Sequence, residues 1–82
     1  MNAIETLTDA GGYERTVYTD GSEPRSGQSV AKIQAGARGF HVTLGFFDRN
    51  QWNGLLETRV MSGKSYKTRK GAETAARNHL TA

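Results

Sequence analysis

The sequence predicts an α+β fold in which an antiparallel sheet of three or four strands is followed by one C-terminal helix packed on one face. Two patterns carry this prediction. Residues 40–47 alternate between an apolar set of side chains and a second, more polar set, as expected for a half-buried strand. Near the end of the chain, small and apolar residues recur at the spacing of one helical face. A sheet with one helix over its apolar side satisfies both patterns.

Four segments have the residue types or the alternation of β-strands. They are residues 13–18, 29–35, 40–47 and 55–61. The third is the clearest, because the apolar residues at even positions from Phe40 to Phe46 share one face, which we expect to meet the core. Loop composition is found at 19–28, and turns are predicted at 36–39, 48–51 and 62–64, which leaves 65–67 extended.

The helix is predicted to begin after Thr68, whose side-chain oxygen can cap the first turn. Its apolar positions follow the spacing i, i+3, i+4, i+7 and i+8, and they are Ala72, Ala75, Ala76, His79 and Leu80. Because this stripe is rich in alanine, the helix can lie close to the sheet. The charged residues of the same segment then remain in solvent.

The 82 residues suffice for one small domain. We expect a flexible tail at residues 1–12, which is polar and ends in two glycines, and a single sheet-plus-helix domain at residues 13–82. The chain has no cysteine, so neither a disulfide nor a thiolate metal site is expected, and no cofactor is predicted. A homodimer is open, because so small a domain gains stability from a second subunit.

The composition favours a soluble, cytoplasmic protein without a membrane partner. The first ten residues include Glu5 and Asp9 and have no continuous apolar stretch, unlike a signal peptide. No segment reaches the apolar length that is needed to span a bilayer. The lack of cysteine fits a cytoplasmic location.

Positive charge is concentrated in the second half of the chain. Residues 1–40 have four basic and five acidic side chains, a net charge of −1, whereas residues 41–82 have seven basic and three acidic ones, a net charge of +4. Between Glu57 and Glu73 no acidic residue interrupts the basic ones. A focused positive surface attracts polyanions, so nucleic acid is the expected partner, with double-stranded DNA ahead of RNA.

The candidate nucleic-acid-binding residues lie on predicted strands, at the last turn and along the helix. They are Lys32, His41, Arg59, Lys64, Lys67, Thr68, Arg69, Lys70 and Arg77. The helix start can hold a phosphate, because unpaired backbone N–H groups there lie next to Thr68 and the neighbouring cations. Trp52, among polar turn residues, is a candidate for stacking on a base or anchoring a protein partner.

Enzymatic activity is not predicted. His41 and His79 have no nucleophile or metal ligand at a recognisable spacing. The run Tyr18-Thr19-Asp20-Gly21-Ser22 is similar to the first-strand signature of ribonuclease H enzymes, in which the aspartate binds catalytic metal. This chain is too short for that fold, so Asp20 is interpreted as a loop residue.

The run from Phe40 to Leu80 resembles the small three-stranded-sheet-plus-helix domains at the amino termini of phage tyrosine integrases. The resemblance rests on an aromatic, a basic residue and a threonine, Tyr66-Lys67-Thr68, leading into a helix with a basic start and an alanine-rich face. It implies that the sheet lies in the major groove of DNA, with Lys32, His41 and Arg59 on the exposed face and Lys67 and Arg69 on phosphate. Glu57 departs from the pattern, since it shares a strand face with Arg59.

Two other classes of function stay open at this point. One is a small interaction protein of phage or plasmid type that inhibits a host protein, such as a CRISPR effector, by binding an acidic surface of it. Size and the lack of catalytic groups permit this interpretation. The other is a structural dimer in which the open sheet face buries Phe47 or Leu55 against a second copy.

Overall fold

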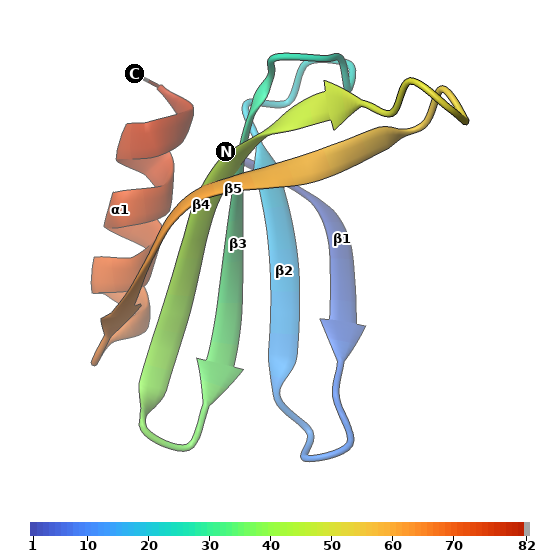
Figure 1. Ribbon diagram of the computed structural model, residues 1–82. Coiled ribbons are helices and arrows are strands. Elements are labelled where there is room, and N and C mark those ends of the chain that lie inside the picture. The colour runs from blue at the N-terminus through green and yellow to red at the C-terminus, as the bar shows by residue number, and fades with distance from the viewer. Residues whose placement is uncertain (82) are drawn as a thin grey trace.

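The structure, a computed structural model, describes residues 1–81, which form one five-stranded antiparallel sheet and one helix. The strands lie in the sheet in chain order, so each pairs with its neighbour along the sequence (Figure 1). The elements are β1 (Asn2–Thr8), β2 (Glu14–Thr19), β3 (Ser29–Gly36), β4 (Gly39–Arg49), β5 (Leu56–Tyr66) and α1 (Arg69–Leu80). The predicted class, the antiparallel sheet and the C-terminal helix are confirmed, but the number of strands is five.

The additional strand is β1, which lies in the segment assigned from the sequence to a flexible tail. It pairs with β2 from Asn2 opposite Thr19 to Thr8 opposite Glu14, with a register shift between Ala3 and Glu5. All seven of its side chains are exposed. Because neither face of β1 is buried, its sequence carries no alternation of apolar and polar residues from which a strand could be predicted.

The prediction of a turn at residues 62–64 is wrong, because β5 runs without interruption through this segment. Leu44 pairs with Ser62 and Gly45 pairs with Val60, so Met61 is an extra residue, a β-bulge. At Gly45 a Cβ atom would collide with the backbone oxygen of Arg59, and only glycine lets the two strands approach this closely.

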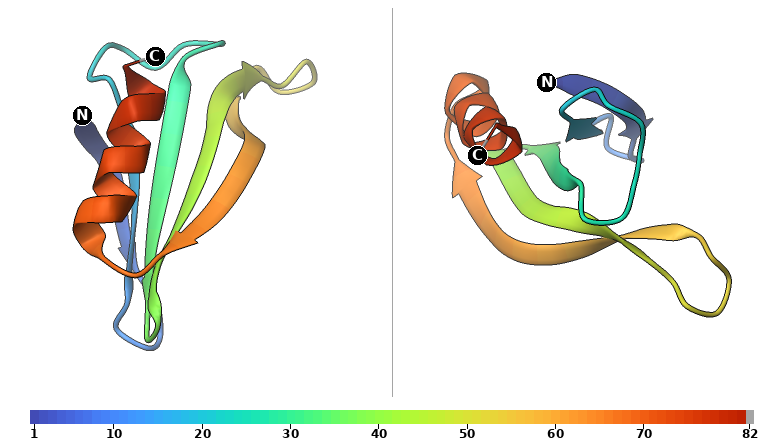
Figure 2. Two further views of the ribbon diagram at one scale, coloured as in Figure 1. Left: turned by 90° about the vertical axis from the view of Figure 1, so that its left-hand side faces the viewer. Right: turned by 90° about the horizontal axis from the view of Figure 1, so that it is seen from above.

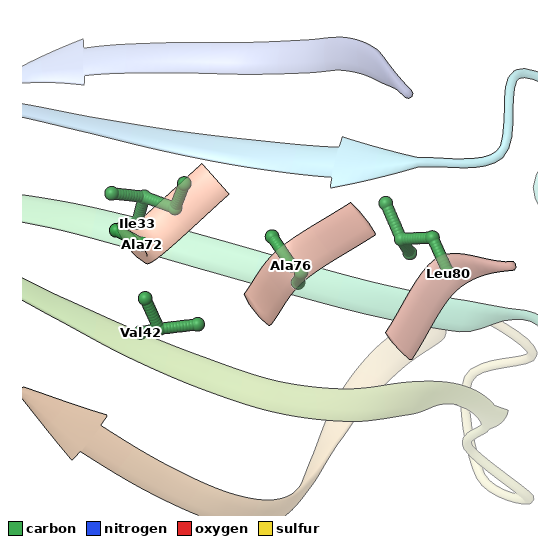
Figure 3. Packing of buried hydrophobic residues seen from close by; sticks show 6 residues of the cluster. Ile33, Val42, Ala72, Ala76 and Leu80 are labelled. Atoms are coloured by element: carbon green, nitrogen blue, oxygen red, sulfur yellow. The ribbon is translucent and has the colours of Figure 1, made fainter. Parts of the chain in front are cut away.

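Helix α1 packs on one face of the sheet, which we call the helix face. Ala72, Ala76 and Leu80 lie over Ile33 and Val42 in the main buried cluster (Figure 3). The predicted cap is confirmed, since Oγ1 of Thr68 accepts a hydrogen bond from Gly71 N at 3.1 Å. No helix in residues 1–81 is long and apolar enough to cross a membrane.

The end of the helix is tied to the sheet by a histidine. Nε2 of His79 lies 2.8 Å from the carbonyl oxygen of Gly45, at the same place where β4 and β5 approach closely. His79 is half-buried on the apolar side of the helix, as its spacing predicts. The contact joins the last turn of α1 to β4.

A second, smaller cluster is buried on the opposite side of the sheet, which we call the open face. It contains Val17, Val30 and Phe47, with Leu56 packed against them. The far end of the β4–β5 hairpin bends away from the rest of the sheet and its tip stands clear of the other elements (Figure 2). The alternation of residues 40–47 predicts that Phe47 lies on the face opposite the expected core. Phe47 does lie on that face, and the second cluster buries it there.

Candidate functional site

The open face carries a polar surface on the half of the sheet that the second cluster does not occupy. Side chains alternate along each strand, and the register places Arg15 of β2, Gln34 of β3, His41 of β4 and Ser65 of β5 in one row across the sheet. The next row contains Lys32 and, on β4 and β5, a threonine and a glycine, and it borders the second cluster, because Val17 of β2 pairs with Lys32. Helix α1 lies on the other side, and Arg15, His41 and Ser65 are exposed on this one.

No acidic residue projects from the open face of strands β2 to β5. Alternation through the paired registers assigns Asp48 and Glu57 to the helix face, together with Glu14. On these four strands the open face therefore has only basic charged side chains, Arg15, Lys32 and Arg49, with the imidazole of His41 beside them. Strand β1 adds one carboxylate to this face, because Glu5 pairs with Val17. This arrangement gives the open face an excess of positive charge, which attracts phosphate groups.

His41 is positioned by its neighbour on β5. Its Nδ1 lies 3.2 Å from the hydroxyl oxygen of Ser65, and the imidazole is exposed. His41, Ser65 and Gln34 also line an open hollow of about 410 Å³, which continues around the β3–β4 turn to Tyr66. The sequence predicted that His41 points to solvent or to a ligand on the open face, and the structure places it there.

Four of the predicted cations gather where β5 ends and α1 begins, a region we call the corner. They are Lys64, Lys67, Arg69 and Lys70. Two of them are held over aromatic rings: Nζ of Lys64 lies 5.6 Å from the centre of the Tyr66 ring, and Cζ of Arg69 lies 4.9 Å from the centre of the Phe40 ring. The first turn of α1 contains no acidic residue that would offset them.

Arg38 joins this group, although the sequence gave no reason to include it. The β3–β4 turn brings Gly39 so close to β5 that a Cβ atom there would lie 3.3 Å from the Cα atom of Lys67. Arg38 precedes Gly39 and lines the same hollow as Tyr66. Arg15 was also missed. The strand that contains Arg15 and the turn that contains Arg38 were both predicted correctly. Which residues lie beside them on neighbouring strands depends on the strand register, which the structure shows.

Thr68 contributes less to a phosphate site than the sequence suggested. Its Oγ1 already accepts the hydrogen bond from Gly71, and Ala72 N donates to the carbonyl oxygen of Thr68 at 3.2 Å. Two N–H groups of the first turn are thus used within the helix. The corner is better described as a cluster of exposed cations than as a backbone cradle.

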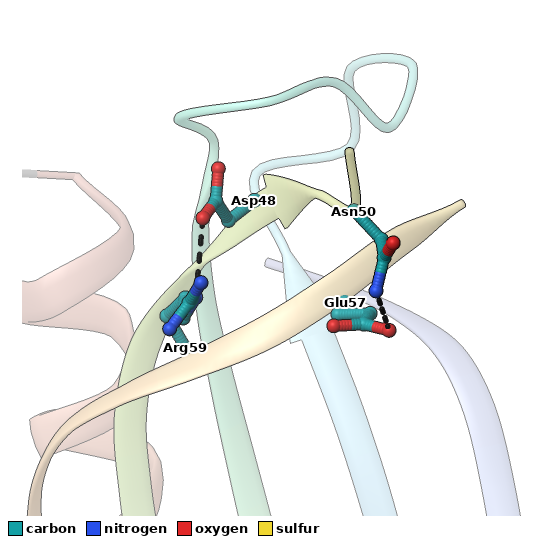
Figure 4. A network of polar contacts seen from close by, with 4 residues as sticks. All are labelled: Asp48, Asn50, Glu57 and Arg59. Carbon is teal, nitrogen blue, oxygen red and sulfur yellow. Dashed lines mark hydrogen bonds and ion pairs between the residues drawn. The ribbon is translucent and has the colours of Figure 1, made fainter. Parts of the chain in front are cut away.

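Arg59 does not share a face with Lys32 and His41, contrary to the expectation for a DNA-binding sheet. It pairs with Phe46, which puts it on the helix face, beyond the part that α1 covers. Its Nε donates to Oδ2 of Asp48 at 3.1 Å (Figure 4). This is the only ion pair within 4.0 Å among residues 1–81, so the charge of Arg59 is offset locally.

Arg77 and Trp52 are also separated from the main group. Arg77 is exposed in the last turn of α1, about 12 Å along the helix from Arg69 at 1.5 Å per residue. Trp52 is 95% exposed at the tip of the β4–β5 hairpin, where Trp52 N donates to Oδ1 of Asn50 at 2.7 Å. Neither residue adjoins the corner or the polar rows of the open face.

Asp20 lies in the loop after β2, as interpreted from the sequence. Hydrogen bonds from the Ser22 side chain and backbone, and from the Gln28 side chain, lower the pKa of Asp20 to about 2. In the part of the chain that the structure describes, no three His, Asp or Glu side chains are grouped to hold a metal ion. These hydrogen bonds link Asp20 to Ser22 and Gln28 within the loop between β2 and β3.

Comparison of the chain with protein-family models, with curated proteins and with solved structures finds no match.

Proposed function

We propose that this protein is a small, non-enzymatic nucleic-acid-binding protein that takes duplex DNA on its open sheet face. The observation that carries the proposal is the absence of acidic side chains from the open face of β2 to β5, which presents Arg15, Lys32 and His41. Neutralising phosphates with such residues releases counterions, and that release drives sequence-independent binding.

The corner cations extend this surface at one end. Lys67 lies next to the β3–β4 turn and directly follows Tyr66, whose neighbour Ser65 is in the row with His41. Arg69 has limited freedom because it stacks on Phe40, so less side-chain entropy is lost when it binds a phosphate. We assign phosphate contacts to Lys67, Arg69 and Lys70 of the corner and to Arg15 and Lys32 of the open face, and contacts in the groove to the uncharged polar residues of that face.

The proposal is tested by fluorescence anisotropy with a labelled random-sequence duplex. The double variant Arg15→Gln/Lys32→Gln removes two open-face charges, so the slope of log affinity against log salt should become shallower by about 1.8. Arg77→Gln is the matched control, because it removes an exposed charge that lies away from this surface. Equal effects of the open-face variant and the control would reject the open face as the binding surface.

A protein partner is the second candidate, and the exposure of Trp52 favours it. A tryptophan that is 95% exposed on an ordered turn has the large rigid surface typical of interface anchors. An inhibitor of a host nucleic-acid-handling protein would hold its target at high salt, where DNA is released. Trp52→Ala would then abolish the salt-resistant complex, whereas the Arg15→Gln/Lys32→Gln variant would retain it.

A further inference from the structure

Strand β5 is an uncovered edge of the sheet. It pairs only with β4, and each of its side chains is exposed or half-buried. Natural proteins protect such edges with proline, lysine or bulges, because the unpaired N–H and C=O groups can join another strand. The segment from Leu56 to Val60 contains neither proline nor lysine, and the bulge at Met61 lies just beyond it.

This segment also has an unbalanced charge pattern. Asp48 lies directly opposite Glu57 across the β4–β5 ladder, on the same face (Figure 4). Arg59 reaches diagonally to Asp48, whereas Glu57 has only the side-chain amide of Asn50, whose Nδ2 lies 3.0 Å from Oε1. The carboxylate of Glu57, which has no cationic partner, therefore lies two residues from the guanidinium of Arg59 on an uncovered strand edge.

We propose that β5 pairs in antiparallel fashion with β5 of a second copy of this chain, about a two-fold axis that passes through Thr58. In this register Glu57 of each copy lies directly opposite Arg59 of the other, which supplies the missing cation twice. On the other face, Leu56 of each copy lies opposite Val60 of the other. Val60 is 65% exposed in the single chain, and the pairing covers it.

The choice of Thr58 as the axis follows from charge. In a two-fold antiparallel pair, residues that lie opposite each other must project from the same face, so the axis passes through a residue. An axis at Glu57 would place two carboxylates against each other, and an axis at Arg59 would place two guanidinium groups there. Like charges directly opposite are destabilising, and opposite charges stabilise. Of these three registers, only Thr58 at the axis gives two ion pairs.

In the same register, exposed apolar residues near the β4–β5 hairpin of one copy lie close to those of the other copy. Leu55 is 63% exposed and Met61 is 66% exposed, and the antiparallel direction brings Leu55 of each copy to the end of the paired segment at which the bulge at Met61 of the other copy lies. The hairpin tip with Trp52 then extends alongside the second copy's β5 beyond the bulge. The only tryptophan of the chain thereby becomes a reporter of association.

The inference is tested by measuring the mass of the protein in solution by light scattering. A dimer of the 9.0 kDa chain gives about 18 kDa, and dilution should shift the emission of Trp52 as it returns to solvent. A mass of 9.0 kDa at all attainable concentrations would overturn the proposal. Neither readout involves nucleic acid, so the proposed DNA binding can fail without affecting this result.

The register is tested by a cysteine at the proposed axis, since the chain has none of its own. Residues paired across an antiparallel ladder have Cα atoms about 4.5–5.5 Å apart, within the range of a disulfide. Thr58→Cys should therefore form a covalent dimer under mild oxidation. Val60→Cys is the matched control, because the two copies of residue 60 would be about 13 Å apart along the strands. Cross-linking of both variants to the same extent would contradict the register.

Charge reversal gives an independent test. Arg59→Glu places two carboxylates opposite each other and should yield a monomer, and the double variant Glu57→Arg/Arg59→Glu restores opposite charges and should restore the dimer. Glu5→Lys, on the opposite edge strand β1, is the control and should leave the mass unchanged. Circular dichroism verifies that each variant is folded. A dimeric Arg59→Glu variant, or a folded double variant that stays monomeric, would overturn the proposal.

Discussion

The guanidinium carbon of Arg69 lies 4.9 Å from the centre of the Phe40 ring, so the first residue of α1 is held against the second residue of β4. The positive end of the helix dipole opposes a cation at this position, and the aromatic face offsets part of that cost. The contact fixes a positive charge at the corner. It also links the stability of the helix start to the proposed binding surface.

Replacing Arg69 separates these two roles. Arg69→Lys keeps the charge but loses the planar stacking, so we expect the free energy of unfolding to fall by about 0.5–1 kcal/mol while the salt dependence of DNA binding is unchanged. Arg69→Gln should in addition make the salt slope shallower by about 0.9. Urea unfolding and fluorescence anisotropy measure the two effects. A lysine variant with the shallower slope of the glutamine variant would show that stacking and not charge matters.

The close approach of β4 and β5 predicts that Gly45 cannot be replaced. In Gly45→Ala the added methyl group meets the backbone oxygen of Arg59, which cannot move without breaking the ladder at the bulge. We expect a loss of about 1–3 kcal/mol in the free energy of unfolding, as for other overpacked sites. Gly36→Ala is the control, because a Cβ atom there has its nearest neighbour at 3.8 Å. Equal losses in the two variants would contradict the close approach.

The alanine stripe of α1 predicts a similar sensitivity in the main cluster. Ala76 is completely buried between the helix and the sheet, so Ala76→Leu should push α1 away from β3 and destabilise the protein by about 1–3 kcal/mol. Adding the same bulk at exposed Thr74 should have little effect. Denaturant unfolding of both variants provides the measurement. A tolerated leucine at position 76 would mean that the helix does not lie against the sheet as described.

Asp20 predicts a pH dependence of stability. Its pKa is lowered to about 2 by hydrogen bonds from Ser22 and Gln28, whereas an unfolded aspartate has a pKa of about 3.9. Because the folded state favours the ionised form, the stabilisation is fully present above pH 4 and is lost as the pH falls toward 2. Asp20→Asn should therefore lose stability less steeply than the wild type over this range.

Urea titrations between pH 2 and pH 5 measure this difference, since the other carboxyl groups contribute equally to both proteins. Glu23→Gln removes an acid from the same loop and serves as the control. If Asp20→Asn and the wild type lose stability in parallel as the pH falls, the hydrogen bonds to Asp20 do not stabilise its ionised form.

The elements with a buried face could be predicted from the sequence, and those without one could not. Phe40 to Leu44 and the alanine stripe alternate at the periods of a strand and a helix because one side of each meets the core. β1 buries no side chain and has no such period. The turn chemistry of Ser62 and Gly63 was overridden by pairing with β4, which continues past the bulge at Met61.

The membership of the candidate site depends on register, which the sequence does not determine. Arg59 was assigned to the face of Lys32 and His41, but its pairing with Phe46 puts it on the other face. In a regular strand, residues that share a face are an even number of positions apart. The extra residue at Met61 reverses this alternation, so Arg59 and Lys64 lie on the same face. Arg15 entered the site for the same reason, through its pairing with Gln34.

The salt dependence of the affinity for a random-sequence duplex tests the central proposal most directly. With five phosphate contacts from the open face and the corner, log affinity should fall with log salt at a slope of about −4.5. The triple variant Lys67→Gln/Arg69→Gln/Lys70→Gln should bring the slope to about −1.8 and abolish binding near physiological salt. A slope near zero for the wild type, or an unchanged slope for the triple variant, would contradict the account.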